Sequence, residues 1–192
     1  MAKVYFYYAA MNAGKTTHLL QARYNYMERG MKTICLKPAT DVRDGIETIK
    51  SRIGLEAPCY AVQDSESIYS IIKEQLPAAC VLVDEAQFLN EHQVIEICKS
   101  CDNLDIPILC YGLRSDFLGK PFPGSALLLA QADVLVELKT ICHCGKKATM
   151  NMRLDENGLP VHEGNQVLIG GNDQYISVCR KHFYEADTGA TK

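Results

Sequence analysis

One short segment, residues 3–16, restricts the fold more than any other part of the chain. It begins with the β-branched and aromatic run KVYFYY, continues through AAMNA and ends in GKT, where helical spacing of apolar residues begins. A strand that turns into a helix at Gly-Lys-Thr directs successive backbone N–H groups, and the positive end of the helix, towards one point. The pattern is typical of a phosphate-binding loop, although Ala9 stands where the usual pattern has its first glycine.

The chemistry of the loop residues predicts a separate role for each of two side chains. Lys15 is placed to reach the β- and γ-phosphates of a nucleotide, and the Thr16 hydroxyl is placed to bind Mg²⁺. The alternative is an ordinary strand–turn–helix unit that happens to contain GKT. The predicted nucleotide loop consists of Ala9, Ala10, Met11, Asn12, Ala13, Gly14, Lys15 and Thr16.

Residues 3–138 alternate short apolar runs with longer stretches of helical spacing. This alternation is typical of βαβ units, so we predict an α/β fold with a parallel sheet flanked by helices. The length of 192 residues allows one main domain and a small appendage. The predicted strands are residues 3–8, 32–37, 80–83, 106–111 and 134–138, and the predicted helices are residues 15–29, 65–76 and 90–101.

Two adjacent acids follow the wholly apolar run CVLV at residues 80–83. Such a run is expected of a central parallel strand, whose carboxyl end is where open α/β sheets bind ligands. Asp84 is placed to hold Mg²⁺ through water, and Glu85 to accept the proton of an attacking hydroxyl or to orient a water. For Glu85 the alternative is a solvated acid at a strand end. Arg43 and Arg52, in the long polar segment 39–56, are candidates for phosphate contact or for solvated positions in a lid.

Cysteine and histidine gather after residue 139, in a segment rich in short alternating pieces and turn signals. The predicted metal ligands are Cys142, Cys144, Cys179 and His182. Three thiolates and one imidazole suit tetrahedral Zn²⁺ and leave no open position, so we predict a structural site. His143 and His162 compete as ligands, and the alternative is a set of unrelated free cysteines. We therefore divide the chain into residues 1–139, a nucleotide-binding domain, and residues 140–192, a small zinc-binding β-rich domain.

Composition excludes several other functions. The net charge is −3, so no general grip on a nucleic-acid backbone is expected. No apolar run approaches the ~20 residues of a membrane-spanning helix, and the N-terminus lacks the pattern of a signal peptide. The chain has nine cysteines, an odd number, several of them inside apolar runs, which indicates a reducing compartment. We predict a cytoplasmic protein without membrane or nucleic-acid partners, and interpret the Cys98–Cys101 pair on a predicted helix as incidental.

Five segments together resemble one family across nearly the whole chain. They are AAMNAGKT at 9–16, VLVDEAQF at 81–88, YGLRSDFLGKPF at 111–122, ELKTICHCGKKA at 137–148 and VLIGGNDQYISVCRKH at 167–182. The sequence resembles the type II, or cytosolic-type, thymidine kinases, and in particular their bacterial branch, which shares the Cys-x-Cys spacing and His182. The resemblance implies a P-loop (RecA-like) fold, and an enzyme that transfers the γ-phosphate of ATP to the 5′-hydroxyl of thymidine, giving dTMP for nucleotide salvage.

The resemblance also implies roles for individual residues. Glu85 would be the catalytic base, while Asp84 and Gln87 would join the loop in binding ATP and Mg²⁺. The residues expected at the nucleoside are Met11, Leu113, Phe117, Phe122, Leu168, Ile169, Gly170, Gly171 and Tyr175. Residues 168–175 would form a lasso across the base, with the zinc site bracing its two ends. By family likeness we further expect a homotetramer and feedback inhibition by dTTP.

Three alternatives remain open from the sequence. The first is a helicase-like or recombinase-like ATPase, in which Glu85 would polarise water, although the short chain and its net charge of −3 disfavour that class. The second is a zinc-ribbon interaction module fused to a nucleotide fold without turnover. The third keeps the chemistry but accepts deoxyuridine or another pyrimidine nucleoside, because discrimination of one methyl group is worth only ~1–3 kcal/mol.

Overall fold

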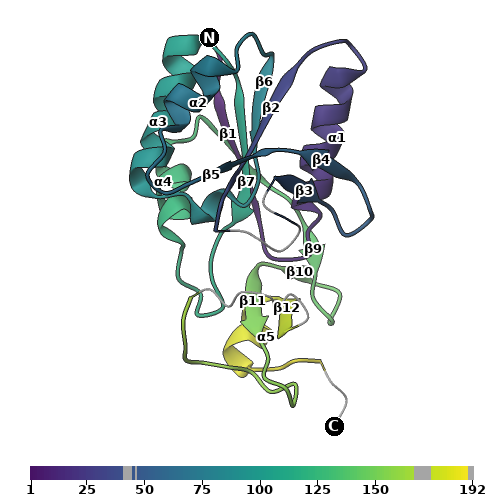
Figure 1. Ribbon diagram of the computed structural model, residues 1–192. Helices are drawn as coiled ribbons and strands as arrows, with labels where there is room; N and C mark the ends of the chain where they lie inside the picture. The colour runs from purple at the N-terminus through teal and green to yellow at the C-terminus, as the bar shows by residue number, and fades with distance from the viewer. Residues whose placement is uncertain (41–44, 46, 167–173, 190–192) are drawn as a thin grey trace.

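The computed structural model describes residues 1–40, 45, 47–166 and 174–189. Its centre is a six-stranded sheet in the order β5-β2-β6-β7-β1-β8, in which every strand pair is parallel (Figure 1). The strands are β1 (Val4–Ala9), β2 (Thr33–Pro38), β5 (Tyr60–Val62), β6 (Cys80–Val83), β7 (Ile108–Leu113) and β8 (Val134–Glu137). The predicted α/β fold with a parallel sheet is confirmed.

Helices cover both faces of this sheet (Figure 1). The helices are α1 (Lys15–Met27), α2 (Ile68–Glu74), α3 (Glu91–Leu104) and α4 (Pro123–Gln131). On one face Leu19 of α1 packs in a buried cluster with Leu82 and Tyr111. On the other face α2, α3 and α4 pack over a larger cluster that contains Phe6 and Val83. Because successive strand residues point to opposite faces, a sheet covered on both sides buries all of β6, which explains its wholly apolar sequence.

The order of the strands brings three strand ends together. β7 lies between β1 and β6, and all three run in the same direction. The loop after Ala9, the acids after Val83 and the end of β7 at Leu113 therefore meet at one edge of the sheet. This is the edge at which open parallel sheets bind ligands.

From residue 140 onward, the described residues form two small strand pairs and a short helix. β9 (Thr140–Ile141) pairs with β10 (Lys147–Ala148), and β11 (Met150–Arg153) pairs with β12 (Tyr175–Val178), both antiparallel. α5 (Arg180–Glu185) follows β12. These elements lie beyond the carboxyl-end edge of the main sheet (Figure 1) and have their own buried cluster, which includes Cys142, Met150 and Val178.

The structure also contains elements that the sequence pattern did not predict. The polar segment 39–56 contributes most of a hairpin of β3 (Thr48–Lys50) and β4 (Glu56–Pro58), and β5 and α4 are additional. Strands of three residues are too short to establish a period of two, so periodicity does not detect them. The predicted helix 65–76 is shorter, since Ser67 caps α2 by accepting a hydrogen bond from the Ser70 N–H at 3.2 Å. Within the described ranges no helix has both the length and the apolar character needed to span a membrane.

Candidate active site and metal centre

The loop between β1 and α1 has the curled backbone expected of a phosphate site. Asn12 and Gly14 both have positive φ, 60° and 72°, and Gly14 immediately precedes α1. No Cβ penalty applies at Gly14, so the turn into the helix forms there without strain. The Lys15 side chain is largely buried and its Nζ donates a hydrogen bond to the Ala10 carbonyl at 3.3 Å, back across the loop. The lysine is thereby held over the space that the loop encloses.

Asp84 lies beside this loop. Its Oδ2 accepts a hydrogen bond from the Thr16 hydroxyl at 3.0 Å, and its Oδ1 accepts one from the Glu85 N–H at 3.0 Å. Burial, followed by the adjacent Glu85 carboxylate, raises the pKa of Asp84 above its usual range, and Thr16, the Glu85 N–H and Lys15 only partly offset this. A carboxylate that is costly to ionise without a cation is suited to holding Mg²⁺, and the hydroxyl–carboxylate pair supplies the oxygen ligands that Mg²⁺ prefers.

Glu85 is oriented by its neighbour Gln87. Glu85 has φ 47°, a left-handed conformation that is costly for a non-glycine residue and turns the chain directly after β6. The Gln87 side-chain amide donates a hydrogen bond to Glu85 Oε2, while its Oε1 accepts one from the Leu113 N–H at 3.0 Å. Gln87 is buried, so its amide links Glu85 to the end of β7. The family resemblance implies that Gln87 binds the nucleotide, whereas in the structure its side chain is hydrogen-bonded to Glu85 and to the Leu113 N–H.

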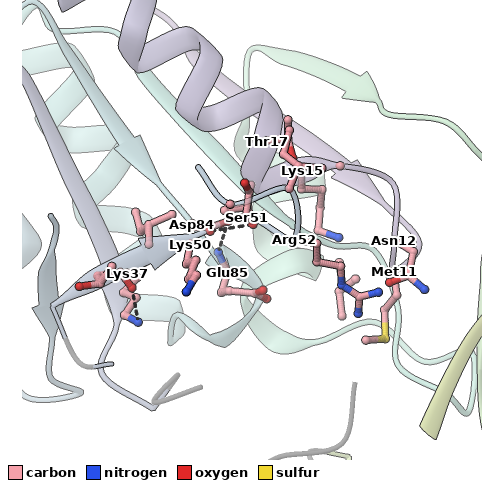
Figure 2. A pocket seen from close by; sticks show the side chains of 17 residues that line it. Met11, Asn12, Lys15, Thr17, Lys37, Lys50, Ser51, Arg52, Asp84 and Glu85 are labelled. Carbon is pink, nitrogen blue, oxygen red and sulfur yellow. Dashed lines mark hydrogen bonds between the residues drawn. The ribbon is translucent and has the colours of Figure 1, made fainter. Parts of the chain in front are cut away.

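A cavity of about 580 Å³ opens over these residues, within the range of small-molecule sites. Of the predicted site residues it is lined by Met11, Asn12, Gly14, Lys15, Thr16, Arg52, Asp84, Glu85 and Leu113. Arg43 lies outside the described residues. Figure 2 shows Lys15, Lys50 and Arg52 around the same cavity as Glu85. This concentration of basic side chains suits a polyphosphate.

Apart from Arg52, sequence reasoning missed the lining residues that come from β2 and the β3–β4 hairpin. Lys37 is 2% exposed, and its Nζ donates hydrogen bonds to the carbonyls of Gly45 at 2.6 Å and Thr48 at 2.9 Å. It thereby ties the start of the hairpin to β2, and Lys50 and Ser51 follow into the cavity. The available signal in the sequence was a lysine at the end of an apolar strand run, next to a long polar segment. The strand pairing that brings the hairpin over the site is not visible in the sequence.

The aromatic residues predicted at the nucleoside lie elsewhere in the described part of the chain. Phe117, Phe122 and Tyr175 are not among the described residues that line the cavity. Phe117 is buried, with the Arg153 guanidinium 3.6 Å from its ring centroid, and Phe122 packs edge-on against Phe88. The predicted nucleoside residues Leu168, Ile169, Gly170 and Gly171 lie outside the described residues.

The four predicted metal ligands come together. The ligand atoms of Cys142, Cys144, Cys179 and His182 all lie within 4.8 Å of one another, and His182 Nδ1 is 3.3 Å from Cys142 Sγ. The His182 backbone N–H contributes most to lowering the pKa of the Cys179 thiol, which favours the thiolate that a metal requires. All nine cysteines are free of disulfide bonds. This donor set fits a tetrahedral Zn²⁺ site.

The competing histidines have different positions. The His143 ring stacks on the His182 ring at 4.3 Å between centroids, and His143 forms a second group with His182 and Asp187. Within the described residues, His162 belongs to neither group. His182 faces the cysteines through Nδ1 and Asp187 through Nε2, the latter at 3.7 Å. The geometry therefore favours His182 as the fourth ligand.

Comparison with known proteins gives one consistent result. A family model described as thymidine kinase matches residues 2–183. The thymidine kinase of Legionella pneumophila (strain Lens) is 57% identical over 195 residues, covering 100% of this chain and 93% of the relative. The thymidine kinase of Yersinia pseudotuberculosis is 57% identical over 189 residues (97% of this chain, 96% of the relative), and that of Zymomonas mobilis 56% over 188 residues (96% and 97%). With a phosphate-loop site at the carboxyl edge of its sheet and relatives matched from end to end, the chain belongs to the thymidine kinase family.

Proposed function

We propose that this protein transfers the γ-phosphate of ATP to the 5′-hydroxyl of thymidine, producing dTMP and ADP. The observation that carries the proposal is that Glu85 lines the cavity beside the Thr16–Asp84 pair, in a chain of a family whose members are named thymidine kinase. A phosphate loop supplies the donor site. A half-buried carboxylate next to it supplies a group that accepts the proton of an alcohol.

The residues around the cavity have distinct roles in this reaction. The phosphate loop and Lys15 would bind the ATP phosphates, and Arg52 and Lys50 would contact the same charge from the hairpin. Thr16 and Asp84 would hold the Mg²⁺ that accompanies ATP and neutralises its developing charge. Glu85 would remove the proton of the 5′-hydroxyl while the hydroxyl oxygen forms a bond to the γ-phosphorus of ATP. The bond from that phosphorus to the bridging oxygen then breaks, and ADP leaves.

The nucleoside would bind on the side of the cavity formed by Met11 and Leu113. From the family resemblance, Phe117, Phe122, Tyr175 and residues 168–171 complete this subsite, with the base against apolar and aromatic side chains. We propose a domain boundary at 139/140. The cluster of Cys142, Cys144, Cys179 and His182 would be a structural Zn²⁺ site, and it would brace the segment that lies between the Cys142–Cys144 pair and the Cys179–His182 pair. A homotetramer, a cytoplasmic location and feedback inhibition by dTTP complete the proposal by family likeness.

The first experiment is a steady-state assay with Mg-ATP in which ADP release is compared with and without thymidine and the nucleotide product is identified. We expect release that depends on thymidine and yields dTMP. Deoxyuridine in parallel reports how far the 5-methyl group is recognised. Release that ignores every nucleoside but rises with DNA or RNA would overturn the proposal in favour of a motor-like ATPase.

A further inference from the structure

The backbone N–H and carbonyl of Met11, a residue of the phosphate loop, are both hydrogen-bonded to the distant strand pair β11–β12. The Met11 N–H donates a hydrogen bond to Asn151 Oδ1 at 2.7 Å, and the Met11 carbonyl accepts one from the Ser177 hydroxyl at 2.5 Å. Asn151 and Ser177 are directly opposite one another in the antiparallel pairing of β11 with β12. Side chains opposite each other project from the same face of a strand pair, so the two contact the backbone of one residue from one surface.

The orientation of the Asn151 amide is determined by both of its ends. Asn151 is 2% exposed, and while its Oδ1 accepts from Met11, its Nδ2 donates to the Ser115 carbonyl at 2.8 Å. A reversed amide would set its NH₂ against an N–H and its oxygen against a carbonyl, leaving two buried groups unsatisfied. Asn151 therefore joins the phosphate loop to the chain just beyond β7, and it does so in one orientation.

This contact changes how the loop can work. The Met11 N–H is engaged by Asn151, so it is directed away from any phosphate in the loop. Met11 lines the cavity (Figure 2) and precedes Asn12, whose positive φ begins the curl of the loop. Fixing both the N–H and the carbonyl of Met11 therefore sets where that curl begins. The positions of Gly14 and Lys15, which follow Asn12 in the chain, depend on where the curl begins.

We propose that Asn151 and Ser177 are positioning residues for the nucleotide, and that together they clamp Met11 so that the phosphate loop is held in its binding shape. The clamp is carried by strands beyond residue 139, so this part of the chain contributes to the donor site as well as to the acceptor site. The inference rests on the proposed function only in taking ATP as the ligand of the loop.

The sharpest test is Ser177→Ala, which removes one hydroxyl from a half-buried position. The dissociation constant of Mg-ATP is measured without nucleoside, and the KM values of ATP and thymidine are measured separately. We expect the dissociation constant and the KM of ATP to rise about 2- to 10-fold, the range for loss of one hydrogen bond, with a smaller change in the KM of thymidine. Ser177→Thr, which keeps a hydroxyl on a strand, should restore binding.

The matched control is Ser100→Ala. Ser100 is fully buried, but its hydroxyl donates to the Glu96 carbonyl within α3, on the sheet face opposite α1. It should leave Mg-ATP binding unchanged. Equal ATP affinity in Ser177→Ala and the wild type, or an equal loss in Ser100→Ala, would show that no clamp exists.

A second pair of variants separates the two ends of Asn151. Asn151→Asp keeps an oxygen acceptor for the Met11 N–H but loses the donor to Ser115, whereas Asn151→Leu loses both. We expect ATP binding to weaken more in Asn151→Leu, and equal effects would contradict the clamp on Met11. Because ATP binding is measured without turnover, an ATP effect in a protein that fails to phosphorylate thymidine would refute the proposed function alone. Full thymidine turnover with unchanged ATP binding in all variants would refute the clamp alone.

Discussion

Thr16 Oγ1 and Asp84 Oδ2 are 3.0 Å apart and hydrogen-bonded, although 68 positions separate them in the sequence. Thr16 lies in the first turn of α1 and Asp84 follows β6, and β7, the strand between β1 and β6, brings the ends of those two strands to the same edge of the sheet. The fold itself holds the hydroxyl and the carboxylate together. A cation that arrives with ATP therefore meets a prearranged set of oxygens, which lowers the reorganisation needed for binding.

Removal of the Glu85 carboxylate should separate chemistry from binding. In Glu85→Gln we expect kcat to fall by roughly 10²–10⁴-fold, because an amide cannot accept the proton of the 5′-hydroxyl, while Mg-ATP affinity stays nearly unchanged. Steady-state kinetics and ATP titration measure the two effects. The control is Glu74→Gln, an exposed acid at the end of α2, which should behave as wild type. Unchanged turnover in Glu85→Gln would remove this residue from the mechanism.

Gln87 should affect kcat because its side chain orients Glu85. Gln87→Met keeps the length of the side chain but loses both the donor to Glu85 and the acceptor for the Leu113 N–H. We expect kcat to fall by about 10-fold or more because Glu85 is no longer held, with little change in the KM of ATP. The comparison is made by steady-state kinetics with a thermal melt alongside. A large rise in the KM of ATP at unchanged kcat would instead assign Gln87 to the nucleotide, as the sequence had suggested.

The ionised carboxylate of Asp84 should lower the free energy of unfolding when no cation is bound. Because its folded pKa lies above the unfolded value, the neutral form stabilises the fold, and that contribution is complete below about pH 4 and is lost as the pH rises through the folded pKa. Asp84→Asn carries no such charge. In buffer without Mg²⁺ or nucleotide it should therefore be more stable than wild type near neutral pH, by about 1 kcal/mol or more, with the difference vanishing near pH 4. Chemical denaturation at several pH values measures this, and a pH-independent difference would contradict it.

Loss of one cysteine should unfold the metal centre. In Cys179→Ser we expect zinc content below one per chain and a lower Tm, with a loss of about 2 kcal/mol corresponding to roughly 4–8 °C. Thymidine affinity should fall at the same time, because Cys179 directly follows β12 and so borders the proposed lasso. Metal analysis, melting curves and nucleoside titration give the three values. Cys98→Ser, on α3 and outside the cluster, is the control, and a stable, active, metal-free Cys179→Ser protein would contradict the bracing role.

Local pattern was sufficient for every strand of the main sheet except β5. The GKT turn and the apolar run of β6 each appear in the structure at the predicted place, and the predicted helix from residue 90 begins with a capping box of Asn90 and Gln93. Each of these signals is contained within a few consecutive residues, since burial on both faces, helix capping and a tight turn depend on neighbours in the chain. The same reasoning identified the three cysteines and the histidine that the structure brings into one cluster, because thiol and imidazole spacing is itself a local signal.

The sequence by itself determined the α/β class, the glycine-lysine-threonine loop, the pair of acids and which cysteines and histidine form the cluster. Only the tertiary structure decided that Lys37 and the β3–β4 hairpin enter the cavity, that Gln87 holds Glu85, and that Asn151 and Ser177 grip Met11. The last two contacts span 140 and 166 positions, and they exist because β11 and β12 dock at the carboxyl edge of the sheet. Hydrophobic periodicity specifies which face of an element is buried, but not which distant polar group it will meet.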